Sequence, residues 1–264
     1  MDSIALLGIN LAIICAVFAG LWTLAQITRD PSFVDAFWAF GAALLAVSSF
    51  VLANGWEPRK ALIAGLVLVW GLRLGMHLFL RWRREGADRR YEGLLAGARE
   101  QRGWSYGRTT ALFVFAPQAV LLWVMSLPAQ LGQVSPDQGF TALAAIGTVL
   151  ALSGIAFETL ADLQLQRFKA DARSKGQVME TGLWAWSRHP NYFGEAVTWW
   201  GIWLIAAETT PGLFAIAGPV FVTFTLIKWS GAPMLERGLH KSRPGYAAYV
   251  KRVSPFIPWP PKRG

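Results

Sequence analysis

Seven long apolar stretches constrain this chain more than any other feature. They cover about residues 4–27, 34–53, 61–80, 109–131, 139–161, 190–208 and 211–230. A helix needs roughly 20 mostly apolar residues to cross about 30 Å of hydrocarbon, and these continuous runs lack the alternation of barrel strands. We therefore predict an all-α integral membrane protein, with seven transmembrane helices in one bundle and a single domain over 1–264.

The composition agrees with a membrane class. Hydrophobic residues make up 54% of the 264 and charged residues only 16%, against about 25% charged residues in soluble domains. Three His and the lone Cys15 exclude a disulfide framework and offer too few ligands for a Cys/His zinc site, so we predict no metal. The first stretch lacks the basic start and cleavage site of a signal peptide and reads as a retained span. Pro117 and Pro128 should kink or end the fourth helix.

The basic residues predict the orientation. In a seven-span arrangement, 22 of the 25 Lys and Arg fall on one side, at Arg29, in the segments 81–108 and 162–189, and from Lys228 onward. Only Arg59 and Lys60 fall on the other side. The positive-inside rule then places the N-terminus outside and the C-terminal tail in the cytoplasm. We expect cofactor-binding loops at 81–108, 162–189 and 231–264.

A cationic face is predicted along the third stretch. Arg73, His77, Arg81 and Arg84 are spaced by four, four and three residues, which stacks them on one side of a helix. Such a face could hold a phosphorylated ligand whose reactive end reaches into the membrane. Alternatively, Arg81 and Arg84 extend to the headgroups while Arg73 is simply paired.

Carboxylates also lie in or beside the apolar stretches. Asp35 sits early in the second stretch, one turn before Trp38. An ionisable group there costs a few kcal/mol unless it is paired or faces a wet cavity, so we expect it to be functional. Glu158 and Asp162 share a face at the end of the fifth stretch. They either pair with the bases of 167–175, order a ribose, or orient the arginines of the cationic face.

The densest polar segment is Ser187–Glu195, which leads into the sixth stretch. Pro190 suits the first turn of a helix, and Arg188, His189 and Asn191 would crowd its N-terminus, where an anion or amide binds favourably. Glu195 follows on the face of Asn191, with Trp199 one turn further. Ordinary capping with headgroup contact is the alternative.

Several other signals are excluded or weak. The G-x-S-x-G match at 103–107 lies in an Arg-rich segment without the strand–turn–helix elbow that a serine hydrolase needs. No Rossmann or P-loop pattern occurs. The net charge of +9 resides beside the apolar stretches, so we expect no nucleic-acid partner. His240, beside Lys241 and close to Tyr246, is a loop residue that could touch ligand phosphates.

Four segments together resemble a known group. These are Asp35-Ala-Phe-Trp38, Trp70-Gly-Leu-Arg73-Leu, the Ser187–Glu195 segment, and the closing Tyr246-Ala-Ala-Tyr with Pro-Phe-Ile-Pro-Trp259. They resemble the bacterial membrane proteins related to steroid 5-alpha-reductases over nearly the whole chain. Membrane methyltransferases of the isoprenylcysteine and phospholipid type carry a similar Arg-His-Pro-x-Tyr helix start.

The resemblance implies seven helices around an NADPH that enters from the cytoplasm. It implies reduction of the carbon–carbon double bond of an α,β-unsaturated ketone in a steroid or related lipid. Asn191 would contact the nicotinamide amide with support from Glu195, Asp162 would address the adenosine half, and Arg81 and Arg84 would lie near the phosphates. The further cofactor contacts that we expect come from Lys169, Arg188, His189, Tyr192, Trp199, His240 and Tyr246.

The expected catalytic residues are Asp35, Trp38, Trp70 and Arg73. Reducing an enone places negative charge on its carbonyl oxygen, which must meet a donor. That donor would be Asp35, kept protonated by apolar surroundings, or a water or Trp38 that it holds. Animal enzymes of the family instead use a Gln-Glu pair and a Tyr, and Trp70 occupies the expected Tyr position here. The substrate therefore need not be a 3-keto-4-ene steroid.

Two other functions compete with the reductase. An S-adenosylmethionine-dependent lipid or isoprenylcysteine methyltransferase would bind its cofactor at the Arg188–Tyr192 segment, but it gives Asp35 and Arg73 no task. A transporter or lipid-binding scaffold lacks support, because no repeated halves occur. The resemblance implies a monomeric, multi-pass protein of the bacterial inner membrane, with membrane lipids and an enone lipid as its partners.

Overall fold

The computed structural model describes residues 1–229 and 231–262, apart from the side chain of Arg89. Ser230, Arg263 and Gly264, which fall in the expected seventh span and tail, lie outside the described residues. The chain divides into two compact units. Unit 1 comprises Met1–Thr141 and Ile205–Gly218, and unit 2 comprises Ala142–Leu204 and Pro219–Gly264. The single domain stays a prediction, and each unit is described by itself.

Every regular element in the described part of the chain is a helix, and six helical segments are long and apolar enough to cross a membrane. A multi-pass membrane protein is therefore confirmed. The expected span at 190–208 corresponds to α9 (Pro190–Ala206). This helix has 17 residues and is not one of the six. The seventh span and the orientation stay predictions. The six segments are Ser3–Thr28, Val34–Leu52, Glu57–Glu85, Tyr106–Met125, Ala142–Ala170 and Thr210–Ser242.

Unit 1 contains three long helices and several short ones. The long helices are α1 (Ser3–Thr28), α2 (Val34–Leu52) and α3 (Glu57–Glu85). The short ones are α4 (Arg89–Arg102), α5 (Tyr106–Thr110), α6 (Ala116–Met125), α7 (Leu127–Leu131) and α10 (Thr210–Leu213).

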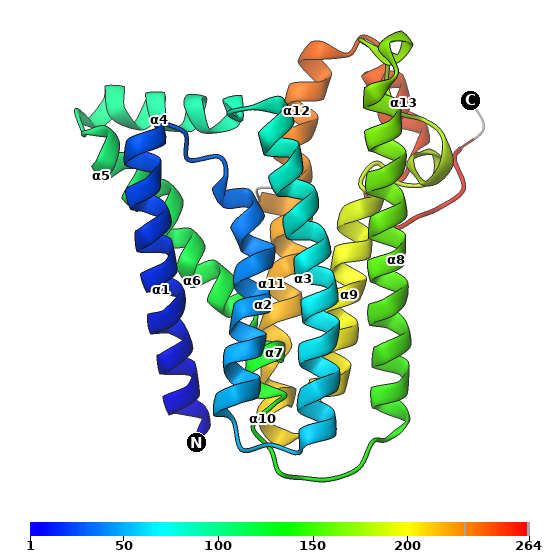
Figure 1. Ribbon diagram of the computed structural model, residues 1–264. Coiled ribbons are helices and arrows are strands. Elements are labelled where there is room, and N and C mark those ends of the chain that lie inside the picture. The colour runs from blue at the N-terminus through cyan, green and yellow to red at the C-terminus, as the bar shows by residue number, and fades with distance from the viewer. Residues whose placement is uncertain (230, 263–264) are drawn as a thin grey trace. The chain divides into compact units, whose positions relative to one another are not determined.

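Part of the segment 81–108, which we expected to be a loop, forms helix α4. Helix α3 continues to Glu85, and α4 then lies across the end of unit 1 at which α1 ends (Figure 1). Asp88 caps α4, because its side chain accepts a hydrogen bond from the backbone N–H of Arg90. Leu95 and Ala98 are buried, so a short apolar face anchors the helix.

The two prolines act as expected. Pro117 is the second residue of α6, and α6 directly follows a π-helical turn, Ala111–Phe115. Pro128 lies in the first turn of α7, after a break at Ser126. A proline removes one backbone donor and clashes with the preceding turn, which explains both interruptions of the expected fourth helix.

A buried polar cluster joins the helices of unit 1. Asn10 of α1 is fully buried, and its Nδ2 donates to Ser49 Oγ of α2 at 2.9 Å and to Gln130 Oε1 of α7 at 3.1 Å. Ser48 Oγ donates to Asn10 Oδ1 at 2.7 Å. In apolar surroundings such side-chain hydrogen bonds fix helices against one another.

Arg59 and Lys60, which the charge pattern places on the opposite side from 22 of the other bases, are both buried. Arg59 is 2% exposed and donates to the carbonyls of Asp137 at 2.9 Å and Gly139 at 3.2 Å. Its Nε lies 3.7 Å from Glu208 Oε2. Lys60 pairs with Glu57 at 2.7 Å. These contacts fasten the connecting segments at one end of unit 1 and explain why the two charges depart from the pattern.

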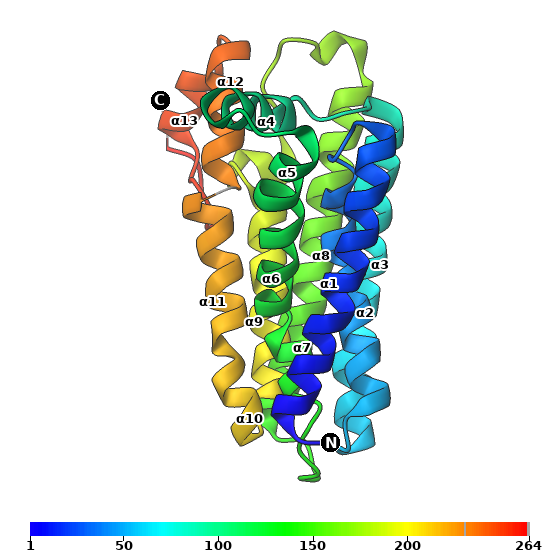
Figure 2. The same ribbon diagram turned by 90° about the vertical axis from the view of Figure 1, so that its left-hand side faces the viewer.

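Unit 2 is built on α8 (Ala142–Ala170) and α9, with α11 (Ala217–Phe224), α12 (Ala232–Ser242) and α13 (Tyr246–Arg252). Because α8 extends to Ala170, it occupies the first part of the expected loop 162–189. Helices α8 and α9 run antiparallel and side by side (Figures 1 and 2). A Cβ on Gly194 would lie 2.6 Å from the backbone N of Glu158, and one on Gly201 would lie 2.4 Å from that of Ala151. Glycine thus permits close backbone contact.

The C-terminal segment is tied to the segment before α9. The Tyr249 hydroxyl donates to the Trp184 carbonyl at 2.7 Å, and Ser187 Oγ donates to the Phe256 carbonyl at 2.7 Å. The Trp259 N–H donates to the Trp186 carbonyl at 2.9 Å. These bonds fix the backbone immediately before His189.

We predict that Gly201→Ala lowers the free energy of unfolding by about 1–3 kcal/mol, the usual cost of overpacking, because the backbone of α8 blocks the added methyl group. The matched control is Gly8→Ala in α1, where a Cβ meets nothing within 4 Å and alanine has the better helix propensity. Thermal unfolding in detergent, followed by circular dichroism, measures both. Equal melting temperatures for the two variants would contradict the packing of α8 against α9.

Candidate functional site

Asp35 is the centre of a polar cluster in unit 1. It lies in the first turn of α2, and its carboxylate binds two residues at the start of α4. Arg90 Nη2 donates to Asp35 Oδ2 at 3.0 Å, and the Tyr91 hydroxyl donates to Asp35 Oδ1 at 2.5 Å. Both oxygens of Asp35 therefore accept hydrogen bonds, and the donor at this position is the phenol of Tyr91.

Helix α6 extends the cluster and fixes the direction of its hydrogen bonds. Trp38 Nε1, which can only donate, donates to Gln118 Oε1 at 2.6 Å. The Gln118 amide nitrogen then donates to the Tyr91 hydroxyl oxygen at 3.3 Å. Because that oxygen accepts from Gln118, the Tyr91 hydrogen is directed to Asp35. Gln118 is thus a positioning residue for the phenol.

A second arm of the cluster ties α4 to the connection between α1 and α2. Arg90 also binds Asp88, with its Nη2 2.7 Å from Asp88 Oδ2. The Asp88 N–H donates to Ser32 Oγ at 3.1 Å, and Ser32 Oγ donates to Asp30 Oδ1 at 2.6 Å. Trp82 Nε1 donates to Asp30 Oδ2 at 2.7 Å. The start of α4 is therefore held from α2, α3 and α6.

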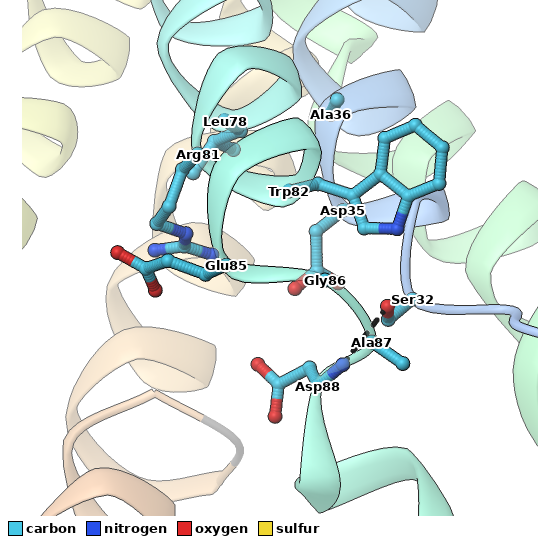
Figure 3. Close-up of a pocket in the computed structure, with 10 residues that line it drawn as sticks. All are labelled: Ser32, Asp35, Ala36, Leu78, Arg81, Trp82, Glu85, Gly86, Ala87 and Asp88. Atoms are coloured by element: carbon cyan, nitrogen blue, oxygen red, sulfur yellow. Dashed lines mark hydrogen bonds between the residues drawn. The ribbon is translucent and has the colours of Figure 1, made fainter.

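A cavity of about 290 Å³ adjoins this cluster. Figure 3 shows it at the turn from α3 to α4, with the hydrogen bond from Asp88 to Ser32 beside it. Asp35 lines the cavity directly, and Tyr91 lies one hydrogen bond behind it. A ligand that entered here would reach the carboxylate and then the phenol. The lining residues are Ser32, Asp35, Ala36, Leu78, Arg81, Trp82, Glu85, Gly86, Ala87 and Asp88.

The surroundings control protonation at the start of α4. Burial, together with the charge of Asp35 and the hydrogen bond to it, raises the pKa of Tyr91 well above its usual value. Burial opposes ionisation of Asp88, but the hydrogen bonds and charge of Arg90 bring the pKa of that carboxyl below its usual value. The phenol of Tyr91 therefore stays protonated at neutral pH.

The residues predicted on α3 occupy one continuous helix. Trp70 is buried, Arg73 and His77 are half-buried, Arg81 lines the cavity and Arg84 is exposed. The spacing of the cationic face is therefore realised along α3. Arg90 is the ion-pair partner of Asp35. The sequence analysis missed Arg90, Tyr91 and Gln118.

Unit 2 brings together two residues that we expected to bind a cofactor. Asn191, in the first turn of α9, donates from Nδ2 to Asp162 Oδ1 of α8 at 3.1 Å. The glycine contacts between α8 and α9 set this proximity. The hydrogen bond orients the Asn191 amide, whose carbonyl oxygen is an acceptor.

A second polar group in unit 2 surrounds Glu236 of α12. His189 Nε2 lies 2.9 Å and Arg188 Nε 3.1 Å from Glu236 Oε1. The His189 ring stacks on Tyr192, with centroids 5.4 Å apart. Burial and the charge of Glu236 raise the pKa of Tyr246, which keeps its phenol protonated. Glu236 was missed, since it lies 47 residues from His189 in the sequence.

The remaining predicted residues of unit 2 are distributed around these groups. The rings of His240 and Tyr246 are in edge contact, with centroids 4.9 Å apart. Glu195 is half-buried, Trp199 is fully buried, and Lys169 is exposed in the last turn of α8. The structure thus joins Asp35 and Trp38 through one cluster in unit 1, and Asn191 with Asp162 and His189 with Tyr192 in unit 2. Among the residues that it describes, no group of His, Cys, Asp and Glu is arranged to hold a metal ion.

Comparison with known proteins identifies the family. Residues 21–253 match a family described as "Protein of unknown function (DUF1295)". The chain belongs to the DUF1295 family. DUF1295 is a family of membrane proteins related to steroid 5-alpha-reductases, which agrees with the likeness noted in the sequence.

A relative of this DUF1295 protein occurs in Schizosaccharomyces pombe. It is described as "Uncharacterized protein C594.04c", is 24% identical over 277 residues, and covers 90% of this chain and 75% of its own length. No solved structure matches the chain.

The protonation of Tyr91 predicts a pH dependence. Tyrosine has an ordinary pKa of about 10, and the folded value of Tyr91 is higher. Its contribution to the free energy of unfolding is therefore complete below about pH 10 and is lost as the pH rises through the folded pKa. We expect the melting temperature of Tyr91→Phe to lie below that of wild type near neutral pH, with the gap closing above about pH 10. A gap that is constant with pH, in thermal unfolding followed by tryptophan fluorescence, would contradict the pairing with Asp35.

Proposed function

We propose that this protein is an NADPH-dependent membrane oxidoreductase that reduces the carbon–carbon double bond of an α,β-unsaturated keto lipid. The observation that carries this proposal is the short hydrogen bond from the Tyr91 phenol to Asp35 beside a cavity. The family likeness implies a carboxyl–tyrosine pair at the substrate ketone. Asp35 and Tyr91 form such a pair, although the tyrosine comes from α4 rather than from the position of Trp70.

Tyr91 is the proposed donor to the substrate. Reduction of an enone places negative charge on its carbonyl oxygen, and a fixed donor at that oxygen lowers the barrier. A ketone entering beside Asp35 competes with Oδ1 for the Tyr91 hydrogen. Arg90 then keeps its ion pair with Asp35, and the hydrogen bond from Gln118 keeps the phenol oriented. In this account Asp35 acts as an acceptor that positions the donor, whereas the sequence suggested that the donor is a protonated Asp35 or a water or Trp38 that it holds.

The residues of unit 2 are compatible with the proposed cofactor. NADPH would supply the hydride. Asn191, oriented by Asp162, offers an amide that complements a carboxamide such as that of nicotinamide. Arg188 and Lys169 would supply positive charge for phosphates, and the rings of His189 and His240 would offer hydrogen bonds to them. Glu236 neutralises part of the charge of Arg188, so we expect this ion pair to rearrange when an anion binds.

Methyl transfer from S-adenosylmethionine to a lipid or isoprenylcysteine is the alternative function. The Arg188–Tyr192 segment suits either cofactor. The cluster of unit 1 favours the reductase, because a protonated phenol that donates to a carboxylate lining a cavity suits stabilisation of a ketone and gives methyl transfer no aid. We further propose that the protein acts in the bacterial inner membrane as a monomer, on a lipid or steroid-like enone.

We predict that Tyr91→Phe lowers the single-turnover rate of NADPH oxidation with the best enone by roughly 10²–10³, the usual cost of losing an oxyanion donor. Asp35→Ala should lower it by roughly 10² or more while the protein still folds, because Arg90 keeps its ion pair with Asp88. The measurement follows absorbance of NADPH with a panel of α,β-unsaturated ketones at saturating cofactor.

Tyr106→Phe is the matched control, since it removes a phenol from unit 1 outside the cluster, and it should react at the wild-type rate. Asp35→Asn should retain part of the activity, because an amide oxygen can still accept from Tyr91. Wild-type rates in both Tyr91→Phe and Asp35→Ala would place the donor elsewhere.

A further inference from the structure

Arginines lie on aromatic rings at the end of unit 1 where α4 meets α5. The guanidinium carbon of Arg108 is 4.3 Å, and that of Arg102 is 5.0 Å, from the centroid of the Trp104 ring. Arg102 is also 5.3 Å from the ring of Phe113. At the end of α1, Arg29 lies 5.2 Å from the ring of Tyr106. Aromatic faces thus hold three guanidinium groups in place.

None of these positive charges has a carboxylate partner among the described residues. Arg29, Arg99, Arg102 and Arg108 are all exposed, and we call them the arginine cluster. Within the part of the chain that the structure describes, no ion pair joins any of them to a carboxylate. Two guanidinium groups on one indole repel each other, so an anion between or beside them would be bound favourably.

The depth of the cluster matches the headgroup region of a bilayer. Leu24 and Ile27, on the last turns of α1, are 44% and 76% exposed, and Arg29 follows them directly. Leu112, one turn after Arg108, is 51% exposed. Such apolar side chains on membrane-spanning helices face acyl chains, and Trp and Tyr rings mark the interface. The guanidinium groups therefore lie where the acyl chains give way to phosphates.

The backbone around the cluster is fixed from α1. Trp22 Nε1 donates to the Gly107 carbonyl at 3.0 Å, and Gln26 Nε2 donates to Thr110 Oγ1 at 3.1 Å. Ser105 caps α5 by accepting from the Arg108 N–H at 3.3 Å. The arginine cluster is therefore presented on a rigid corner, which limits the ordering cost of binding.

We propose that the arginine cluster, with Trp104 and Tyr106, is a binding site for the headgroup phosphate of an anionic phospholipid. The acyl chains of that lipid would run along the exposed apolar faces of α1 and α6. This combination of fixed guanidinium groups and adjacent acyl-chain surface distinguishes a lipid from a soluble phosphate. The site is independent of the proposed reductase chemistry.

The test compares lipid retention by the full-length protein. Wild type, extracted from nanodiscs of mixed phosphatidylglycerol and phosphatidylcholine, should retain phosphatidylglycerol preferentially in native mass spectrometry. A basic residue beside an anionic leaflet contributes about fivefold to binding, so Arg102→Ala/Arg108→Ala should retain roughly 30-fold less of it. Arg102→Lys/Arg108→Lys, which conserves charge and hence folding, should lose only the part that depends on planar stacking, so its retention should fall between those of wild type and the Ala pair.

The matched control is Arg167→Ala/Arg173→Ala, which removes two exposed arginines from unit 2 and should retain phosphatidylglycerol as wild type does. If this control lost phosphatidylglycerol to the same extent, retention would depend only on the overall charge of the protein, and the proposal would be overturned. Equal retention of phosphatidylglycerol by wild type, the Lys pair and the Ala pair would also overturn the proposal. Displacement of the lipid by glycerol 3-phosphate at low concentration would assign the site to soluble phosphates instead, which contradicts a lipid site.

Discussion

The carboxylate of Asp35 is the group on which the arrangement of unit 1 depends. A charge at the end of an apolar helix is stable only when it is paired or wet, and Asp35 meets this condition through Arg90 and Tyr91. These two bonds bring the start of α4 over the start of α2 and leave a cavity at the turn between α3 and α4. This partly buried pairing therefore contributes to the position of α4, the protonation of Tyr91 and the opening to the cavity.

The same requirement explains the other polar groups of the chain. In unit 2, Glu236 pairs with Arg188 and His189, while Asp162 orients Asn191. In unit 1, Arg59 donates to two carbonyls and lies within ion-pair distance of Glu208. Arg59 serves the connecting segments, whereas the Asp35 and Asn191 clusters expose groups able to address a ligand. This contrast is why we place chemistry at the latter two.

The sequence predicted what depends on long apolar runs. The first three spans correspond to α1, α2 and α3 within a few residues, and Pro117 and Pro128 interrupt the next helical segment as expected. Asp35 was singled out because burying a carboxylate among apolar residues is costly. Each of these inferences rests on local physics.

Other features could not be predicted, because they depend on contacts between distant residues. Helix α4 has a short apolar face and charges on both sides, so its hydrophobic pattern is weak. Tyr91 lies 56 residues from Asp35, and no spacing rule connects them. Arg59 looked like a loop charge until its partners were known. Helix α9 has 17 residues, fewer than the span that was expected at 190–208.

The central claim is that the oriented amide of Asn191 and the phenol of Tyr91 serve a nicotinamide cofactor and an enone. The most direct test is equilibrium binding of NADPH and of S-adenosylmethionine to one preparation of the purified protein, measured by isothermal titration calorimetry in detergent. The account predicts saturable binding of NADPH and no binding of S-adenosylmethionine. Binding of S-adenosylmethionine without binding of NADPH would contradict it.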